Sequence, residues 1–217
     1  MGRAVVALVG LLSLTAWVGA ALSATNTPTR AISHGCGHAR WNVKTLADRP
    51  KLDKDWQAAT VEELGMKDTP AHVGNNLERQ VGFGRVEFTT FRVDARLVGW
   101  KISPDDQDIH FVIRDLDTNH TLIAEFPADA CVPTADPATG QKGTRKIDRV
   151  HMSAARAAVT KGCSAVKLSS TWRKLRGTIR LVGVGFFDKD HGQKLPAPNR
   201  IELHPVLGAT LIHCAKP

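Results

Sequence analysis

The order of the predicted elements along the chain most limits what this protein can fold into. There are five apolar segments and one helix. We predict strands over residues 91–98, 108–114, 121–126, 178–187 and 200–207. In the first two, apolar and polar residues alternate with a period of two, as in strands with one buried face. An alanine-rich segment over 153–162 begins with a serine cap and stops at a glycine, which predicts a short helix between the third and fourth strands.

Three strands, a helix and then two strands is the chain order of the OB-fold. We therefore predict a mainly β protein, a five-stranded OB-like barrel with one short helix between strands 3 and 4. Gly183 and Gly185 suit a sharply coiled barrel strand. A β-sandwich with a peripheral helix is the alternative, which five long strands fit less well.

The start of the chain indicates export. Residues 1–24 have the form of a signal peptide, because Arg3 precedes an apolar run that closes with the small residues Ser23 and Ala24. An uncleaved anchor is the alternative, since the run is long enough to cross a bilayer. We expect a monomer that is secreted or held in the cell envelope, with no stable membrane span after cleavage.

The remainder divides into an arm and the barrel. Residues 25–85 show little strand periodicity, and we expect an N-terminal arm that packs on the barrel of residues 86–217. Within the arm, Thr60 is placed to cap a short helix.

Four cysteines follow the signal segment, namely Cys36, Cys131, Cys163 and Cys214. In an oxidising compartment we expect them to pair, and four cysteines allow three connectivities. Metal binding by the thiols is the alternative, although no CxxC spacing is present. His34 and His38 flank Cys36 in the word HGCGH, which resembles a copper or zinc site.

Positive charge is concentrated in one stretch. The net charge is +8, and residues 142–180 hold eleven Lys or Arg with Asp148 as the single acid. We predict a basic patch comprising Lys142, Arg145, Lys146, Arg149, Trp172, Arg173, Lys174 and Arg176. Such a patch favours a polyanion or an anionic glycan as partner, and an aromatic beside cations is typical of single-strand binding. A solvated face that keeps the protein soluble is the alternative.

Acidic residues and histidines recur where a barrel could bring them together. Asp108 and His110 share one face of the second strand, and Glu202 and His204 share one face of the fifth. The candidate ligand or metal cluster comprises Asp108, His110, Glu125, Asp188, His191, Glu202 and His204. Carboxylates with imidazoles can hold a divalent metal or supply a general acid and base.

A purely structural interpretation of these residues is also open. Glu125 could pair with a strand arginine such as Arg114, Asp188 could cap a turn, and His110 could hydrogen-bond to His204 at the barrel end.

The C-terminal segment, GVGFFDKDHGQKLPAPNRIELHPV over residues 183–206, resembles a family of small secreted bacterial proteins. Their C-terminal signature has the form "GVGFFD…HGQ…APNGIELHPV". The resemblance extends to the Asp-x-His, Glu-x-Pro and Glu-Leu-His-Pro words of the candidate cluster and to an "RW.VKT" word at 40–45. It implies no particular activity. Arg200 stands where the family usually has glycine, which implies a less tight turn before the fifth strand.

The same resemblance bears on the cysteines. Cys36 precedes the "RW.VKT" word and Cys131 follows EFPADA, where the family has cysteines. This implies a Cys36–Cys131 bridge, which leaves Cys163 to pair with Cys214.

Three functions are compatible with the sequence. The first is a secreted OB-like binding module for an anionic polymer, either nucleic acid or anionic glycan. The second is a secreted, nuclease-like hydrolase that uses a divalent metal in the Asp/His/Glu cluster. The third is a structural envelope protein. The sequence has no P-loop, nucleophile elbow, HExxH or EF-hand word.

Overall fold

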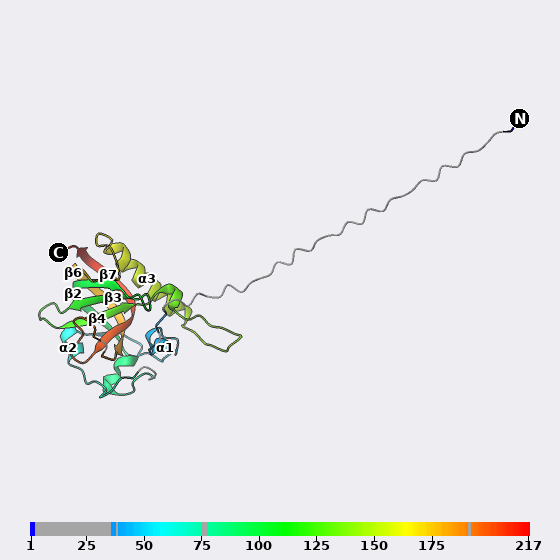
Figure 1. Cartoon of the computed structure of the whole chain (residues 1–217). Coiled ribbons are helices and arrows are strands. Elements are labelled where there is room, and N and C mark those ends of the chain that lie inside the picture. The colour runs from blue at the N-terminus through cyan, green and yellow to red at the C-terminus, as the bar shows by residue number, and fades with distance from the viewer. Residues whose placement is uncertain (3–35, 38, 75–77, 191) are drawn as a thin grey trace. The chain divides into compact units, whose positions relative to one another are not determined.

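The apolar segments form five strands that close into a barrel. In the computed structural model these strands are β2 (Thr90–Ile102), β3 (Ile109–Arg114), β4 (Thr121–Phe126), β6 (Arg176–Phe187) and β7 (Ile201–Ala215). Their order is β2-β3-β4-β7-β6, and β6 pairs back with β2. Within the barrel β4 and β7 are parallel and the other neighbours antiparallel. This arrangement, shown in Figure 1, confirms the predicted OB-like fold.

The structure describes residues 1–2, 36–37, 39–74, 78–190 and 192–217. Almost all of the expected signal segment, together with His34, His38 and His191, lies outside the described residues. Residues 33–217 form one compact unit, which contains the barrel and the segments packed on it. Among the residues described, no helix has the length and apolar character needed to cross a bilayer.

Strand β2 is longer than predicted because it pairs with two neighbours. Residues 90–96 pair with β6, and residues 96–102 pair with β3. A bulge between Leu97 and Gly99 interrupts the register with β3, where it bends the strand. Two short strands, β1 (Gln57–Ala58) and β5 (Arg173–Lys174), also pair with β2. Strand β7 likewise continues along β6 well past the predicted end at residue 207.

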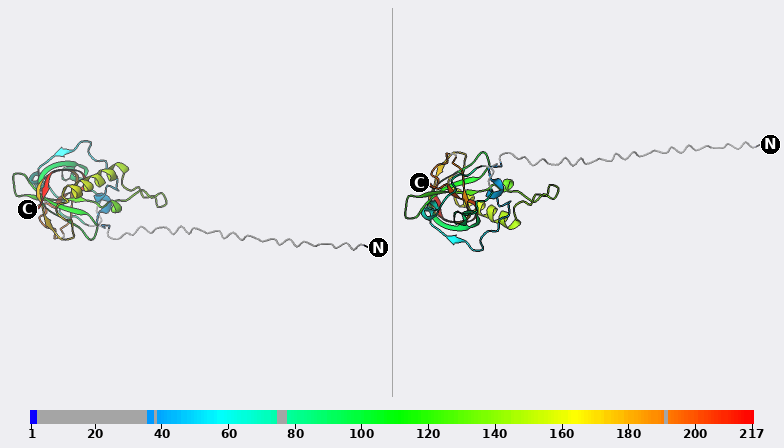
Figure 2. Two further views of the ribbon diagram at one scale, coloured as in Figure 1. Left: turned by 90° about the horizontal axis from the view of Figure 1, so that it is seen from above. Right: turned by 90° about the horizontal axis from the view of Figure 1, so that it is seen from below.

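The helix between β4 and β6 is also longer than predicted. α3 spans Lys146–Gly162, 17 residues, instead of 153–162, and Ser153 lies inside it rather than at its cap. The helix starts earlier because buried Met152 extends the apolar stripe that continues to Val159. In Figure 2, α3 (yellow-green) lies outside the curled strands.

The other helices are short: α1 (Trp41–Lys44), α2 (Val61–Gly65), η1 (Phe83–Phe88) and η2 (Asp129–Cys131). Thr60 caps α2 as predicted. Its hydroxyl accepts the N–H of Glu63, whose carboxylate accepts the N–H of Thr60 in return.

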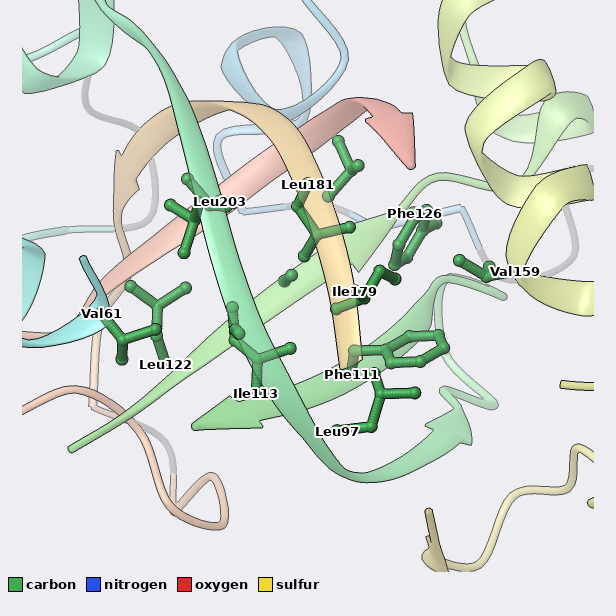
Figure 3. Packing of buried hydrophobic residues seen from close by; sticks show 14 of the residues in the cluster. Val61, Leu97, Phe111, Ile113, Leu122, Phe126, Val159, Ile179, Leu181 and Leu203 are labelled. Carbon is green, nitrogen blue, oxygen red and sulfur yellow. The ribbon is translucent and has the colours of Figure 1, made fainter. Parts of the chain in front are cut away.

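The barrel interior is apolar. Phe111, Leu181 and Leu203 come from three different strands and are fully buried in one cluster (Figure 3). Phe126, at the end of β4, and Val159, in α3, belong to the same cluster. The helix therefore closes one end of the barrel. Burial of these side chains is the main stabilising term of the fold.

Two disulfides fasten the segments outside the barrel. Cys36 is bonded to Cys131, and Cys163 to Cys214, which is the pairing implied by the family resemblance. Both fit a protein of an oxidising, non-cytoplasmic compartment. The first bridge ties the arm to the segment after β4, and the indole N–H of Trp41 donates to the carbonyl of Cys131 beside it.

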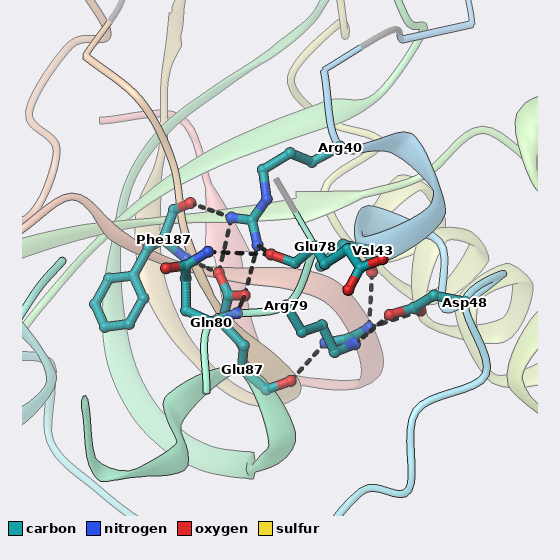
Figure 4. A network of polar contacts seen from close by, with 8 residues as sticks. All are labelled: Arg40, Val43, Asp48, Glu78, Arg79, Gln80, Glu87 and Phe187. Atoms are coloured by element: carbon teal, nitrogen blue, oxygen red, sulfur yellow. Dashed lines mark hydrogen bonds and ion pairs between the residues drawn. The ribbon is translucent and has the colours of Figure 1, made fainter. Parts of the chain in front are cut away.

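A buried ionic network also holds the arm in place (Figure 4). The Arg40 guanidinium pairs with both carboxylate oxygens of Glu87 and donates to the carbonyls of Phe187 and Glu78. The Glu87 carboxylate also accepts the N–H groups of Phe187 and Gln80. Every charge in this network therefore has several partners, and it links the arm to η1 and the end of β6.

The outer face of β3 and β4 is covered as well as the inner one. All of β4, and β3 except Arg114, is buried, although a strand with one solvent face would alternate. Leu46 of the arm, Val132 and Met152 form a second apolar cluster with Val184 of β6. OB-folds bind oligonucleotides and oligosaccharides on this face of their second and third strands. In this protein the arm approaches that face, where Lys44 reaches Glu125 of β4, and the second apolar cluster packs beside it on β6.

Candidate metal centre

Five of the predicted site residues meet beneath the arm: Asp108, His110, Glu125, Glu202 and His204. Because alternate side chains of a strand point to opposite faces, each lies on the outer face while its neighbours fill the barrel. His110 and Glu125 are directly opposed between β3 and β4. The parallel pairing of β4 with β7 sets Glu202 opposite Ile123, which brings His204 alongside Glu125. None of the five is more than 8% exposed.

His204 lies between two carboxylates. Its Nδ1 is 2.9 Å from Glu125 Oε2, and its Nε2 is 3.3 Å from Asp108 Oδ2. The other Glu125 oxygen, Oε1, is 2.9 Å from His110 Nδ1. The ring of Phe186 packs edge-on against His204 with 5.6 Å between centroids. Asp108, Glu125 and His204 thus offer three ligand atoms within 4.8 Å of one another, each fully or almost fully buried.

The polar atoms of this cluster are poorly satisfied. Ten buried side-chain nitrogen or oxygen atoms among the described residues lack a hydrogen bond of acceptable geometry. Seven of them belong to the cluster: Asp108 Oδ2, His110 Nε2, Glu125 Oε2, Gln193 Oε1, Glu202 Oε2 and both ring nitrogens of His204. The Asp108, Glu125 and His204 atoms face one another in the ion pairs described above, and the other three have no such contact with a described residue. Since buried polar groups are nearly always paired, such a concentration calls for an ion or ordered water between them.

Two residues that the sequence analysis did not select complete the cluster. Lys44 of α1 places its Nζ 4.0 Å from Glu125 Oε2. The Gln193 amide donates to Asp188 Oδ2 at 2.7 Å and to Glu202 Oε1 at 3.0 Å, which connects Asp188 to the buried set. Lys44 falls in the "RW.VKT" word and Gln193 in the "HGQ" word of the resembled family. These words were the sequence signal by which the two residues could have been selected.

Burial and neighbouring charges shift the pKa values of the acids in the cluster in opposite directions. Burial raises the pKa of Asp108, and burial together with the charge of Glu125 raises that of Glu202 well above its usual range. Burial alone would raise the pKa of Glu125, but the neighbouring His110, Lys44 and His204 lower it well below its usual range. Burial would lower the pKa of His204, but the Glu125 carboxylate raises it overall. A bound cation would favour the ionised form of all three acids.

The donor set fits a divalent metal of borderline character. Two carboxylate oxygens and one imidazole nitrogen suit Zn²⁺ or Mn²⁺ better than soft metals, which prefer thiolates. All four cysteines are in disulfides, so thiol ligation is excluded. If these three residues held the ion, at least one coordination position would be left for water.

Two of the structural pairings considered for these residues, Glu125 with Arg114 and His110 with His204, do not occur. Glu125 pairs with His110, His204 and Lys44 rather than with Arg114. The two histidines meet through Glu125 and not through a bond to each other.

The predicted basic residues are carried by different elements. Lys142, Arg145, Lys146 and Arg149 lie at the start of α3, where Arg49 of the arm donates to the carbonyls of Lys142 and Gly143. Trp172, Arg173, Lys174 and Arg176 lie at or next to β5, which pairs with the end of β2. Within the described part of the chain, no hydrogen bond or ion pair joins the two groups.

The comparisons with known proteins supply no template for this chain. Compared with family models, curated proteins and solved structures, the chain gives no match. The case for a metal centre accordingly depends on the geometry of the buried Asp108, Glu125 and His204 set.

Proposed function

We propose that this protein is an exported metal-binding protein, in which Asp108, Glu125 and His204 hold one divalent ion against the outer face of an OB-like barrel. One observation carries the proposal: three ligand atoms converge in a buried site where seven polar atoms lack well-directed hydrogen bonds. Export is supported by the leader-like first 24 residues and by the two disulfides.

Elemental analysis of the oxidised protein, purified from the periplasm of an expressing bacterium, tests this proposal. We expect about one equivalent of a divalent metal, removed by chelator and restored by titration with Zn²⁺ or Mn²⁺. His204→Gln and Asp108→Asn should abolish binding. His213→Gln, an exposed histidine on the same strand, should retain it. Metal-free protein that takes up no ion in the titration would contradict the proposal.

Hydrolysis at the same ion is the second candidate function. It is supported by the coordination position that three protein ligands leave for water, whose pKa a bound metal lowers. A pocket of about 660 Å³ has Asp188 in its wall, and Gln193 joins Asp188 to Glu202. Chelator-sensitive cleavage of DNA or RNA, lost in His204→Gln, would establish this activity.

Binding of an anionic polymer would need a surface other than the usual OB face, which the arm covers. The basic residues at the start of α3 border a groove along the helix that includes Lys146, Arg149 and Val150. Retardation of nucleic acid that fades with salt, and is lost when Lys146 and Arg149 are replaced by glutamine, would support this surface.

A further inference from the structure

The cluster already contains a positive charge of its own. Lys44 Nζ lies 4.0 Å from Glu125 Oε2, and its side chain is only 10% exposed. The ammonium also lies 5.3 Å from the centre of the Phe186 ring, the ring that packs against His204. The carboxyl groups of Glu125, Asp188, Glu202 and Asp108 all interact electrostatically with it. Lys44 is therefore a buried cation in an anionic site.

The backbone that carries Lys44 is fixed on both sides. Arg40, four residues earlier, is held by Glu87 and Phe187, and Cys36 is bonded to Cys131. On the other side, the carbonyl of Thr45 accepts the Thr144 hydroxyl, and Leu46 is fully buried. The ammonium cannot leave the carboxylates by a movement of α1 unless these contacts break.

We propose that Lys44 is a built-in competitor of the divalent ion, an ammonium that shares the Glu125 carboxylate with the metal and so sets how tightly the metal is bound. This inference rests on the proposed metal site and concerns its regulation. A dication and an ammonium within a few ångströms repel strongly in a buried site, where water screens them little. With Lys44 in place, the site binds only ions that overcome this repulsion.

Replacement of the ammonium by an uncharged side chain of similar length tests the competition. After chelator treatment, Lys44→Met should bind Zn²⁺ or Mn²⁺ with a Kd about 100-fold lower than that of the unmodified protein. Lys44→Arg keeps the charge and should bind like the unmodified protein. Lys51→Met, an exposed lysine of the same arm, is the matched control and should also leave the Kd unchanged. If Lys44→Met does not fold, Lys44→Gln serves the same comparison.

The outcomes separate this inference from the proposed function. If the unmodified protein binds the ion and Lys44→Met binds it no more tightly than Lys51→Met, the competition is refuted and the metal site stands. If only Lys44→Met binds the ion, the ammonium is the resident cation; the inference is supported and the proposed function fails. If neither protein binds either ion, both are overturned.

Discussion

Two ionic networks are buried between the arm and the barrel, and they differ in how completely their atoms are paired. In the Arg40–Glu87 network, each carboxylate oxygen accepts from the guanidinium and from a backbone N–H group. In the cluster around Asp108, Glu125 and His204, which includes His110, Gln193 and Glu202, seven buried polar atoms lack a well-directed hydrogen bond. A fully paired network stabilises one conformation, whereas an incompletely paired one marks a site that something else completes.

The largest expected effect concerns the paired network. Arg40→Met leaves the Glu87 carboxylate buried without its counter-ion, so we expect the free energy of unfolding to fall by about 3–5 kcal/mol. Urea unfolding at neutral pH measures this. Arg180→Met, which removes an exposed partner of Asp94, should leave the unfolding midpoint nearly unchanged. A loss for Arg40→Met no larger than that of the control would show that the network does not anchor the arm.

A smaller stability effect is expected in the incompletely paired cluster. His204→Gln replaces the ring by an amide that can still donate a hydrogen bond to a neighbouring carboxylate, so the metal-free protein should lose only about 1–2 kcal/mol. Metal should stabilise the unmodified protein and not this variant. Thermal unfolding of the unmodified protein and of His204→Gln, each with and without Zn²⁺, measures this difference. A metal-free loss as large as that of Arg40→Met would mean that both networks are structural.

Asp115 provides a carboxylate that is paired by N–H groups, with no ion pair to any other described residue. It accepts N–H groups of Asp117, Thr118 and Glu62. Burial alone would raise the pKa of Asp115, but these N–H donors lower it below its usual value. The contribution of Asp115 to the free energy of unfolding is therefore fully present above its unfolded-state pKa. It is lost as the pH falls through the lower folded-state pKa.

We expect Asp115→Asn to lose about 1 kcal/mol at pH 7, comparable with the loss of a helix cap. The difference from the unmodified protein should shrink as the pH falls below 4, because protonation weakens the same contacts. Urea midpoints across this pH range provide the measurement. If the difference in stability between Asp115→Asn and the unmodified protein did not change with pH, the loss would arise from altered packing and not from the carboxylate charge.

The smallest expected effect is a gain. Arg200 has φ of 60°, in the left-handed region that favours glycine, and it closes a hydrogen-bonded turn with Ala197. The resembled family usually has glycine at this position, and the turn forms in this protein despite the arginine. Arg200→Gly should stabilise the protein by about 0.5 kcal/mol, the relief of backbone strain being reduced by loss of the Asp190 ion pair. Arg200→Ala, which keeps the strain and loses the ion pair, should destabilise it.

Local patterns predicted the barrel well, because strand and helix periodicity arises from neighbouring residues. The strand over 121–126 and the cap at Thr60 occur as predicted. The errors are in extent: α3 begins at Lys146 and β7 ends at Ala215, since long-range packing and pairing decide where an element stops. The disulfide pairing followed from the family resemblance and not from spacing.

The sequence by itself determined the order of the strands and which residues share a face, so Asp108 with His110, and Glu202 with His204, could be paired in advance. It did not determine whether that face meets solvent. Only the tertiary structure decided that the arm covers it, buries the cluster and adds Lys44 to it. The physical reason is that the arm has no periodic pattern of its own. Its position depends on a disulfide, an ion pair and apolar contacts with residues distant in the chain.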